Sequence, residues 1–194
     1  MFYTRCEKKP SFAWCTQTCS SVEPLPAFHA FTGSDCTSAF VRKGKNGPLK
    51  LLHNNHHAVQ AFLQINTQAN IVSESAALEI EKFVCAMYDK PTFSNTNKVR
   101  YEIFESWYKL QILEKTKSVH NGVDSSLVPP CRTSLRKHCQ RANYQAYLWR
   151  HAHVAQMELP SPDGCGWKLN NDGGLLVVCY HLLYQCAASL HNKG

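Results

Sequence analysis

Basic residues and histidines gather in a stretch of the sequence between Asp35 and Glu74 that contains no acidic residue. Cationic side chains of this kind offset the charge of a nucleic-acid backbone, and amides at helix starts coordinate phosphate oxygens. The stretch therefore predicts a phosphate-binding loop, and the alternative is a solvated surface. Its cations and histidines are Arg42, Lys43, Lys45, Lys50, His53, His56 and His57.

A second basic stretch lies between Asp124 and Glu158. Within it we expect Arg136 and Arg141 to add to the nucleic-acid contact, because this stretch is a second block of positive charge without acidic residues. The alternative is again a solvated helix face. The other basic residues and histidines of this stretch are Arg132, Lys137, His138, Arg150, His151 and His153.

Ten cysteines raise the possibilities of disulfides, a zinc site or a nucleophile. The chain contains no C-x-x-C pair and no signal-like leader, so we expect reduced thiols, with a structural zinc as the alternative. Cys36 beside Asp35 lacks the paired histidine that an activated thiol needs. His53, His56 and His57, together with His151 and His153, are expected at the surface, with metal binding as the alternative.

Aromatic residues on predicted helices admit two interpretations. Trp107, Tyr144 and Trp149 have the types that stack on bases in single-strand binders. Their helical spacing favours packing in the core, which we therefore expect.

The elements that must position these groups are mainly helices. Apolar spacing and turn signals predict helices over 36–41, which Ser34 or Asp35 would cap, and over 49–53, 74–88, 97–115 and 133–157. The residues expected to face the core on the last two are Val99, Ile103, Phe104, Trp107, Leu110, Leu135, Cys139, Ala142, Ala146 and Trp149. A hairpin is predicted from 166–169 and 175–180.

The fold class is therefore mainly α: a helix-turn-helix segment, a bundle of long helices and a small C-terminal β-hairpin. With 194 residues, 44% of them hydrophobic, the chain has enough apolar residues for one modest core. We divide it into an irregular segment (1–26), a helical domain (27–157) and a loop, hairpin and divergent tail (158–194).

Net charge and hydropathy limit the classes of partner that the chain can bind. The formal net charge of +7 favours polyanionic partners. The N-terminus has no apolar core behind its charges, and the longest apolar run, Leu175 to Tyr184, is too short to cross a bilayer and is broken by His181. We therefore expect no secretion signal and no membrane partner.

Residues 27–53, with Gly33-Ser34-Asp35 as the shared core, resemble the helix-hairpin-helix region of flap-endonuclease-like 5′-nucleases. The resemblance implies that Asp35 is a carboxylate ligand of catalytic Mg²⁺ and that Gly44 and Lys45 lie at a turn that grips duplex phosphates. The sequence departs from the family pattern at Arg42, which replaces the first glycine of a G-x-G turn.

A second resemblance covers roughly residues 22–178, which look like the C-terminal half of a family of uncharacterised animal proteins associated with mobile elements. It implies a fragment of a longer protein and an intracellular, nuclear location. The segments that carry it are 25–33, 84–88, 99–104, 129–131, 141–146 and 160–167.

Catalysis needs more than one carboxylate, because two-metal hydrolysis of a phosphodiester requires a cluster of ligands. Only Glu7 and Glu23 precede Asp35. We therefore expect a DNA-backbone-binding fragment without sequence specificity that is catalytically incomplete; if active, it would be a Mg²⁺-dependent structure-specific nuclease. The alternative is a non-catalytic α-helical protein-interaction module, or a decayed fragment that does not bind nucleic acid.

Overall fold

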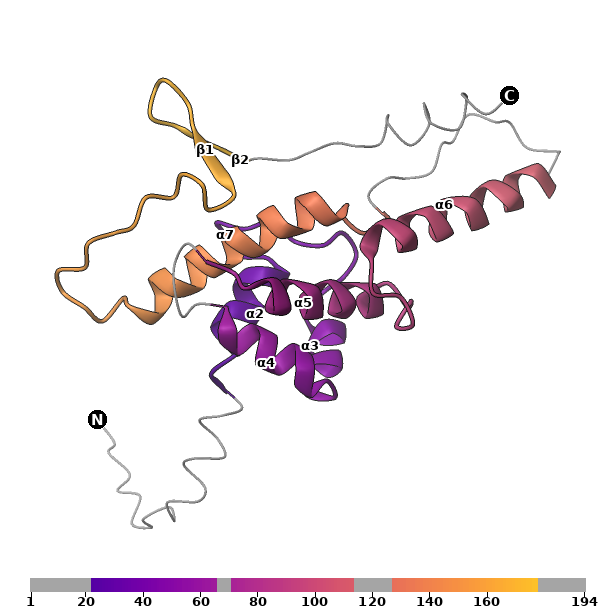
Figure 1. The fold of residues 1–194 in the computed structure, drawn as a ribbon, viewed down its shortest axis with the longest axis horizontal. Helices are drawn as coiled ribbons and strands as arrows, with labels where there is room; N and C mark the ends of the chain where they lie inside the picture. Colours follow the sequence, from indigo (N-terminus) through magenta and orange to yellow (C-terminus); the bar gives the residue numbers. More distant parts are fainter. Residues whose placement is uncertain (1–21, 66–70, 114–126, 178–194) are drawn as a thin grey trace, which may run out of the picture.

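The computed structural model describes residues 22–65, 71–113 and 127–177, and within these ranges the chain is mainly helical (Figure 1). The helices are α2 (Leu25–Thr32), α3 (Asn46–His53), α4 (His56–Gln64), α5 (Glu74–Met87), α6 (Thr96–Leu113) and α7 (Arg132–Arg150). The strands β1 (Trp167–Leu169) and β2 (Leu175–Val177) form one antiparallel hairpin. The predicted fold class, mainly α with a small C-terminal hairpin, is confirmed. None of the helices in the described ranges has the length and hydropathy of a membrane span.

The core is built around phenylalanine side chains from three helices, α2, α4 and α5. Phe62 lies edge-to-face against both Phe28 and Phe83, with ring centroids 5.8 and 5.5 Å apart, and Phe31 closes the group at 5.4 Å from Phe62. Edge-to-face pairs of this kind add to the burial of apolar area. On the opposite side α2 packs against α7 (Figure 1), so one core ties the first described helix to the last.

Helix α6 departs from this compact arrangement. Its first turns pack on α5 through the buried Val99 and the partly buried Ile103, and the rest of the helix projects away from the body (Figure 1). Phe104, which we predicted to face the core, is 47% exposed. The prediction fails there because the helical periodicity extends beyond the surface of α5 that the helix covers.

Helix boundaries follow the capping signals where those exist. Helix α5 begins as predicted after Ser73, whose side chain accepts from the Ala76 amide at 3.2 Å. Helix α4 was not predicted, although Asn55 caps it by accepting from the Ala58 amide at 3.0 Å. Helix α3 begins at Asn46, three residues before the predicted start.

Two predicted helical segments are absent. Residues 36–41 form no helix, because the Thr37 hydroxyl bonds back to Ser34 and to the Ala30 carbonyl and fixes a turn instead. Helix α7 was predicted to reach residue 157 but ends at Arg150. There the His151 ring donates from Nδ1 to the Tyr147 carbonyl at 2.8 Å, and the same carbonyl accepts from the His151 amide at 3.2 Å.

The β-hairpin and the residues just before it are attached to α7 by aromatic packing and by a hydrogen bond. The Trp167 ring packs edge-to-face on Tyr144, with centroids 5.5 Å apart, and Arg141 Nη1 donates to the Gly166 carbonyl at 2.9 Å. Gly166 has a φ of +91°, and a Cβ there would collide with the Lys137 carbonyl. This position therefore requires glycine.

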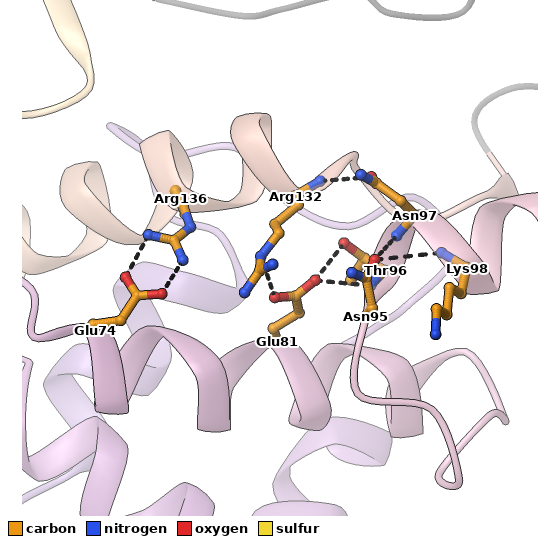
Figure 2. A network of polar contacts seen from close by, with 8 residues as sticks. All are labelled: Glu74, Glu81, Asn95, Thr96, Asn97, Lys98, Arg132 and Arg136. Atoms are coloured by element: carbon orange, nitrogen blue, oxygen red, sulfur yellow. Dashed lines mark hydrogen bonds and ion pairs between the residues drawn. The ribbon is translucent and has the colours of Figure 1, made fainter. Parts of the chain in front are cut away.

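A polar network connects α5, α6 and α7 (Figure 2). The Glu81 side chain is 3% exposed, and its Oε2 lies 3.0 Å from Arg132 Nε of α7. Its Oε1 accepts from the Thr96 amide at 2.9 Å, so the same carboxylate caps α6. Two turns from Glu81, at the start of α5, Glu74 forms a bidentate pair with Arg136. A buried carboxylate is tolerated only when paired and hydrogen-bonded in this way.

We predict that Glu81→Ala lowers the free energy of unfolding by about 3 kcal/mol, because Arg132 and the Thr96 amide lose their buried partner. Urea denaturation followed by circular dichroism measures the change. The control is Glu79→Ala on the same helix, which removes a more exposed pair with Lys82 and should cost less than about 1 kcal/mol. Equal losses in the two variants would show that the buried network adds nothing beyond a surface pair.

We also predict a contribution of His138 to the pH dependence of stability. Burial lowers its pKa from 6.5 to about 4, and Nε2 donates to the Phe31 carbonyl at 2.7 Å. Between these two pH values the unfolded chain binds a proton that the folded chain does not, so stability falls as the pH falls from 6.5 to 4, by about 3 kcal/mol. Urea denaturation across this range should give a flatter profile for His138→Gln than for the wild type. Parallel profiles would contradict the prediction.

Candidate nucleic-acid interface

The loop from Gly33 to Lys45, between α2 and α3, carries the Gly33-Ser34-Asp35 motif and Arg42, Lys43 and Lys45 of the first basic stretch. Gly33 has a φ of +115°, and a Cβ there would lie 2.8 Å from the Ala39 Cα. The glycine of the motif is therefore required by backbone conformation and by close packing of the loop on itself.

Asp35 lies at the exposed tip of a turn closed by hydrogen bonds between Ser34 and Thr37. It caps no helix, since the predicted helix over 36–41 does not form. Within the described ranges no three His, Cys, Asp or Glu side chains come close enough to hold a metal ion. Among the described residues, the exposed Asp35 carboxylate by itself does not provide the several ligands of the Mg²⁺ site that the nuclease resemblance implies.

Arg42 stands where the nuclease family has a glycine, and its backbone adopts the conformation that glycine favours. Its φ is +56°, and the turn is closed by a hydrogen bond from the Lys43 amide to the Phe40 carbonyl at 3.1 Å. The left-handed turn is thus made with an arginine, whose side chain is exposed. Gly44, which follows, has an ordinary φ and open space where a Cβ would be.

The three lysines of the stretch differ in how they are held. Lys43 lies 4.8 Å above the Tyr88 ring and 3.8 Å from Asp89, so part of its charge is offset. Lys45 donates from Nζ to the Gly33 carbonyl at 2.6 Å, and partial burial lowers its pKa. Lys50 is exposed on α3. The loop therefore presents Arg42 and Lys45 to solvent before the start of α3, and Lys50 is exposed in the last turn of that helix.

The N-terminus of α3 adds backbone donors to these side chains. Lys45 occupies the capping position without a side-chain hydrogen bond to the helix. The first amides of a helix have no partner within it, and those of Asn46 and Gly47 lie in the exposed first turn. Pro48 follows at a position where its missing amide hydrogen costs nothing.

The second basic stretch does not form a free cationic surface. Arg141, predicted to contact nucleic acid, is 4% exposed and anchors the hairpin, so this prediction is wrong. Arg136 remains partly exposed, but both of its terminal nitrogens bind Glu74, which holds the pKa of that carboxyl below its usual range. Arg150 donates to the Glu23 carbonyl at 2.7 Å. The acids of α5 and the arginines of α7 are far apart in sequence, so spacing alone did not reveal their pairing.

The remaining candidates separate into core and surface. Burial raises the pKa of the Cys139 thiol to about 12 and that of Cys85 to about 11, so both stay protonated. Tyr144 is buried as predicted. Trp149, predicted to lie in the core, is 38% exposed and stacks on His29 with ring centroids 5.4 Å apart. His53, His56 and His57 are exposed, as predicted.

We predict that the motif contributes to stability through its glycine and not through its carboxylate. Gly33→Ala should lower the free energy of unfolding by about 2 kcal/mol or more through backbone strain and collision with Ala39. Asp35→Asn should change it by less than about 0.5 kcal/mol, and Gly44→Ala is the matched glycine control with a similarly small effect. Chemical denaturation measures all three. A loss in Asp35→Asn as large as that in Gly33→Ala would mean that the carboxylate holds the loop.

Comparison with known proteins adds no relative: no protein-family model, curated protein or solved structure matches the chain. Its function is therefore inferred from the geometry of the loop between α2 and α3.

Proposed function

We propose that the chain binds the phosphate backbone of nucleic acid, without sequence specificity, through Arg42, Lys45 and Lys50 and the first turn of α3. The observation that carries the proposal is the local excess of exposed positive charge. Residues 33–53, the loop and α3, contain four lysine and arginine residues and one acidic residue, Asp35. Asp89 lies 3.8 Å from Lys43 and offsets part of the charge of that lysine.

The chemistry of the loop suits phosphate. Lysine and arginine side chains release counterions when they meet a nucleic-acid backbone, and exposed amides at a helix start bind phosphate oxygens. Contacts of this type position a protein on nucleic acid but carry no sequence information. Binding should therefore depend strongly on ionic strength and weakly on base sequence.

The proposal is for binding and not for cleavage. In the part of the chain that the structure describes, Asp35 is the carboxylate at the loop, and two-metal hydrolysis needs several. We also propose that the chain is a fragment of a nuclease-like protein associated with mobile elements, and that it acts in the nucleus. Both agree with a role in binding nucleic acid.

One observation favours a second candidate, a helical protein-interaction module. Helix α6 exposes three aromatic side chains, Tyr101, Phe104 and Tyr108. Phe104 and Tyr108 stack with centroids 6.3 Å apart and an interplanar angle of 9°. An aromatic helix face of this kind suits a helical segment of a protein partner. It has no bearing on phosphate binding, so the two candidates predict different responses to salt.

Fluorescence anisotropy of the purified chain on a labelled duplex with a single-stranded flap, in EDTA and across a salt series, tests the proposal. We expect affinity to fall steeply with salt, and the slope to become shallower by about one for each phosphate contact removed in Arg42→Ala/Lys45→Ala.

The matched control is Lys98→Ala/Lys168→Ala, which removes the same charge from exposed positions on α6 and β1. If this control weakens binding as much as the loop variant, net charge and not the loop determines affinity. If the wild type does not bind at low salt, the proposal is wrong and the protein-interaction candidate stands.

A further inference from the structure

His29 of α2 joins the cationic loop to an exposed tryptophan. Lys45 Nζ contacts the His29 ring at Nδ1, and the other contact of that ring is the stack with Trp149, at an interplanar angle of 30°. Lys45 and Trp149 are therefore separated by a single imidazole ring. They come from the start of α3 and the end of α7, so the fold and not the sequence brings them together.

The position of Trp149 is unusual for so large an apolar side chain. It lies in the last turn of α7, beyond the buried face formed by Leu135, Cys139, Ala142 and Ala146, and 38% of its surface is exposed. His29 stacks on the indole, and the same imidazole contacts Lys45 of the loop. An exposed indole next to a cation is what base-stacking sites of single-strand binders present.

Lys45 retains the capacity to bind a phosphate. An ammonium group has three N–H donors. One donates to the Gly33 carbonyl at 2.6 Å and one meets His29, which leaves a third for an outside acceptor. The two internal contacts hold the ammonium in place, so less side-chain freedom is lost when a phosphate oxygen binds.

We propose that Trp149, backed by His29, stacks on an unpaired base while Lys45 binds a phosphate of the same strand, so that the preferred ligand is single-stranded nucleic acid. This rests on the proposed phosphate-binding function and names its ligand. A base within a duplex has both faces covered by its neighbours, whereas every unpaired base offers a π-face, so stacking selects single strands without selecting sequence.

The test compares three labelled probes of equal length by anisotropy with the full chain: oligothymidylate, an abasic deoxyribose-phosphate strand and a duplex. We expect Trp149→Ala to weaken oligothymidylate binding about tenfold and to change the affinity for the abasic strand and the duplex less than twofold. Trp149→Phe should retain most of the affinity. Tyr108→Ala, which removes an exposed aromatic residue from α6, is the matched control and should have no effect on any probe.

A second readout follows the indole directly. Oligothymidylate should quench part of the intrinsic tryptophan fluorescence of the wild type, and this quenching should be absent in Trp149→Phe, which keeps the other tryptophans.

Two outcomes would overturn the inference and leave backbone binding intact. In one, Trp149→Ala weakens all three probes equally; in the other, it weakens none while salt-dependent binding persists. No binding of any probe by the wild type would instead reject the proposed function and this inference with it.

Discussion

The Glu81 carboxylate is the constraint on which the arrangement of the long helices depends. It is buried between α5, α6 and α7, and a charge in that position has to be matched by donors from its surroundings. Arg132 at the start of α7 and the Thr96 amide at the start of α6 supply them. The Arg132 amide also donates to Asn97 Oδ1 at 3.0 Å (Figure 2). The start of α7 is therefore bonded directly to the start of α6, in addition to the Glu81 carboxylate that both share.

This arrangement determines which cations remain at the surface. Because α7 lies along α5, its arginines meet Glu74 and Glu81, and Arg141 is taken by the hairpin. Asp89 lies 3.8 Å from Lys43 of the loop between α2 and α3, and the acidic residue of the loop itself, Asp35, is exposed. The two basic stretches look alike in sequence, yet Arg132, Arg136 and Arg141 of the second are engaged within the fold, whereas Arg42, Lys45 and Lys50 of the first are exposed.

Much of the fold could be predicted from sequence, and the failures have physical causes. Apolar periodicity together with a capping residue located α5, and glycine and asparagine spacing located the hairpin. The prediction of a helix over 36–41 was wrong because the Thr37 hydroxyl donates to the Ala30 carbonyl and holds the segment in a turn. Helix periodicity does not report a contact of this kind. Helix α4 was overlooked although Asn55 gave the same capping signal as Ser73.

The candidate site was predictable in part. Local charge identified the loop, and the structure keeps Arg42, Lys45 and Lys50 exposed there. Contacts between residues far apart in the chain were not predictable. The loss of Arg141 to the hairpin, the pairing of Arg136 with Glu74 and the approach of Trp149 to Lys45 through His29 each depend on how α7 crosses its neighbours.

The central claim, that the loop between α2 and α3 meets nucleic acid, is tested most directly by NMR. In a titration of the ¹⁵N-labelled chain with a short flapped duplex at low salt, we expect the amide resonances of Arg42, Gly44, Asn46 and Gly47 to shift first, with salt reversing the shifts. Unchanged loop amides, or shifts confined to the aromatic segment of α6, would contradict the claim.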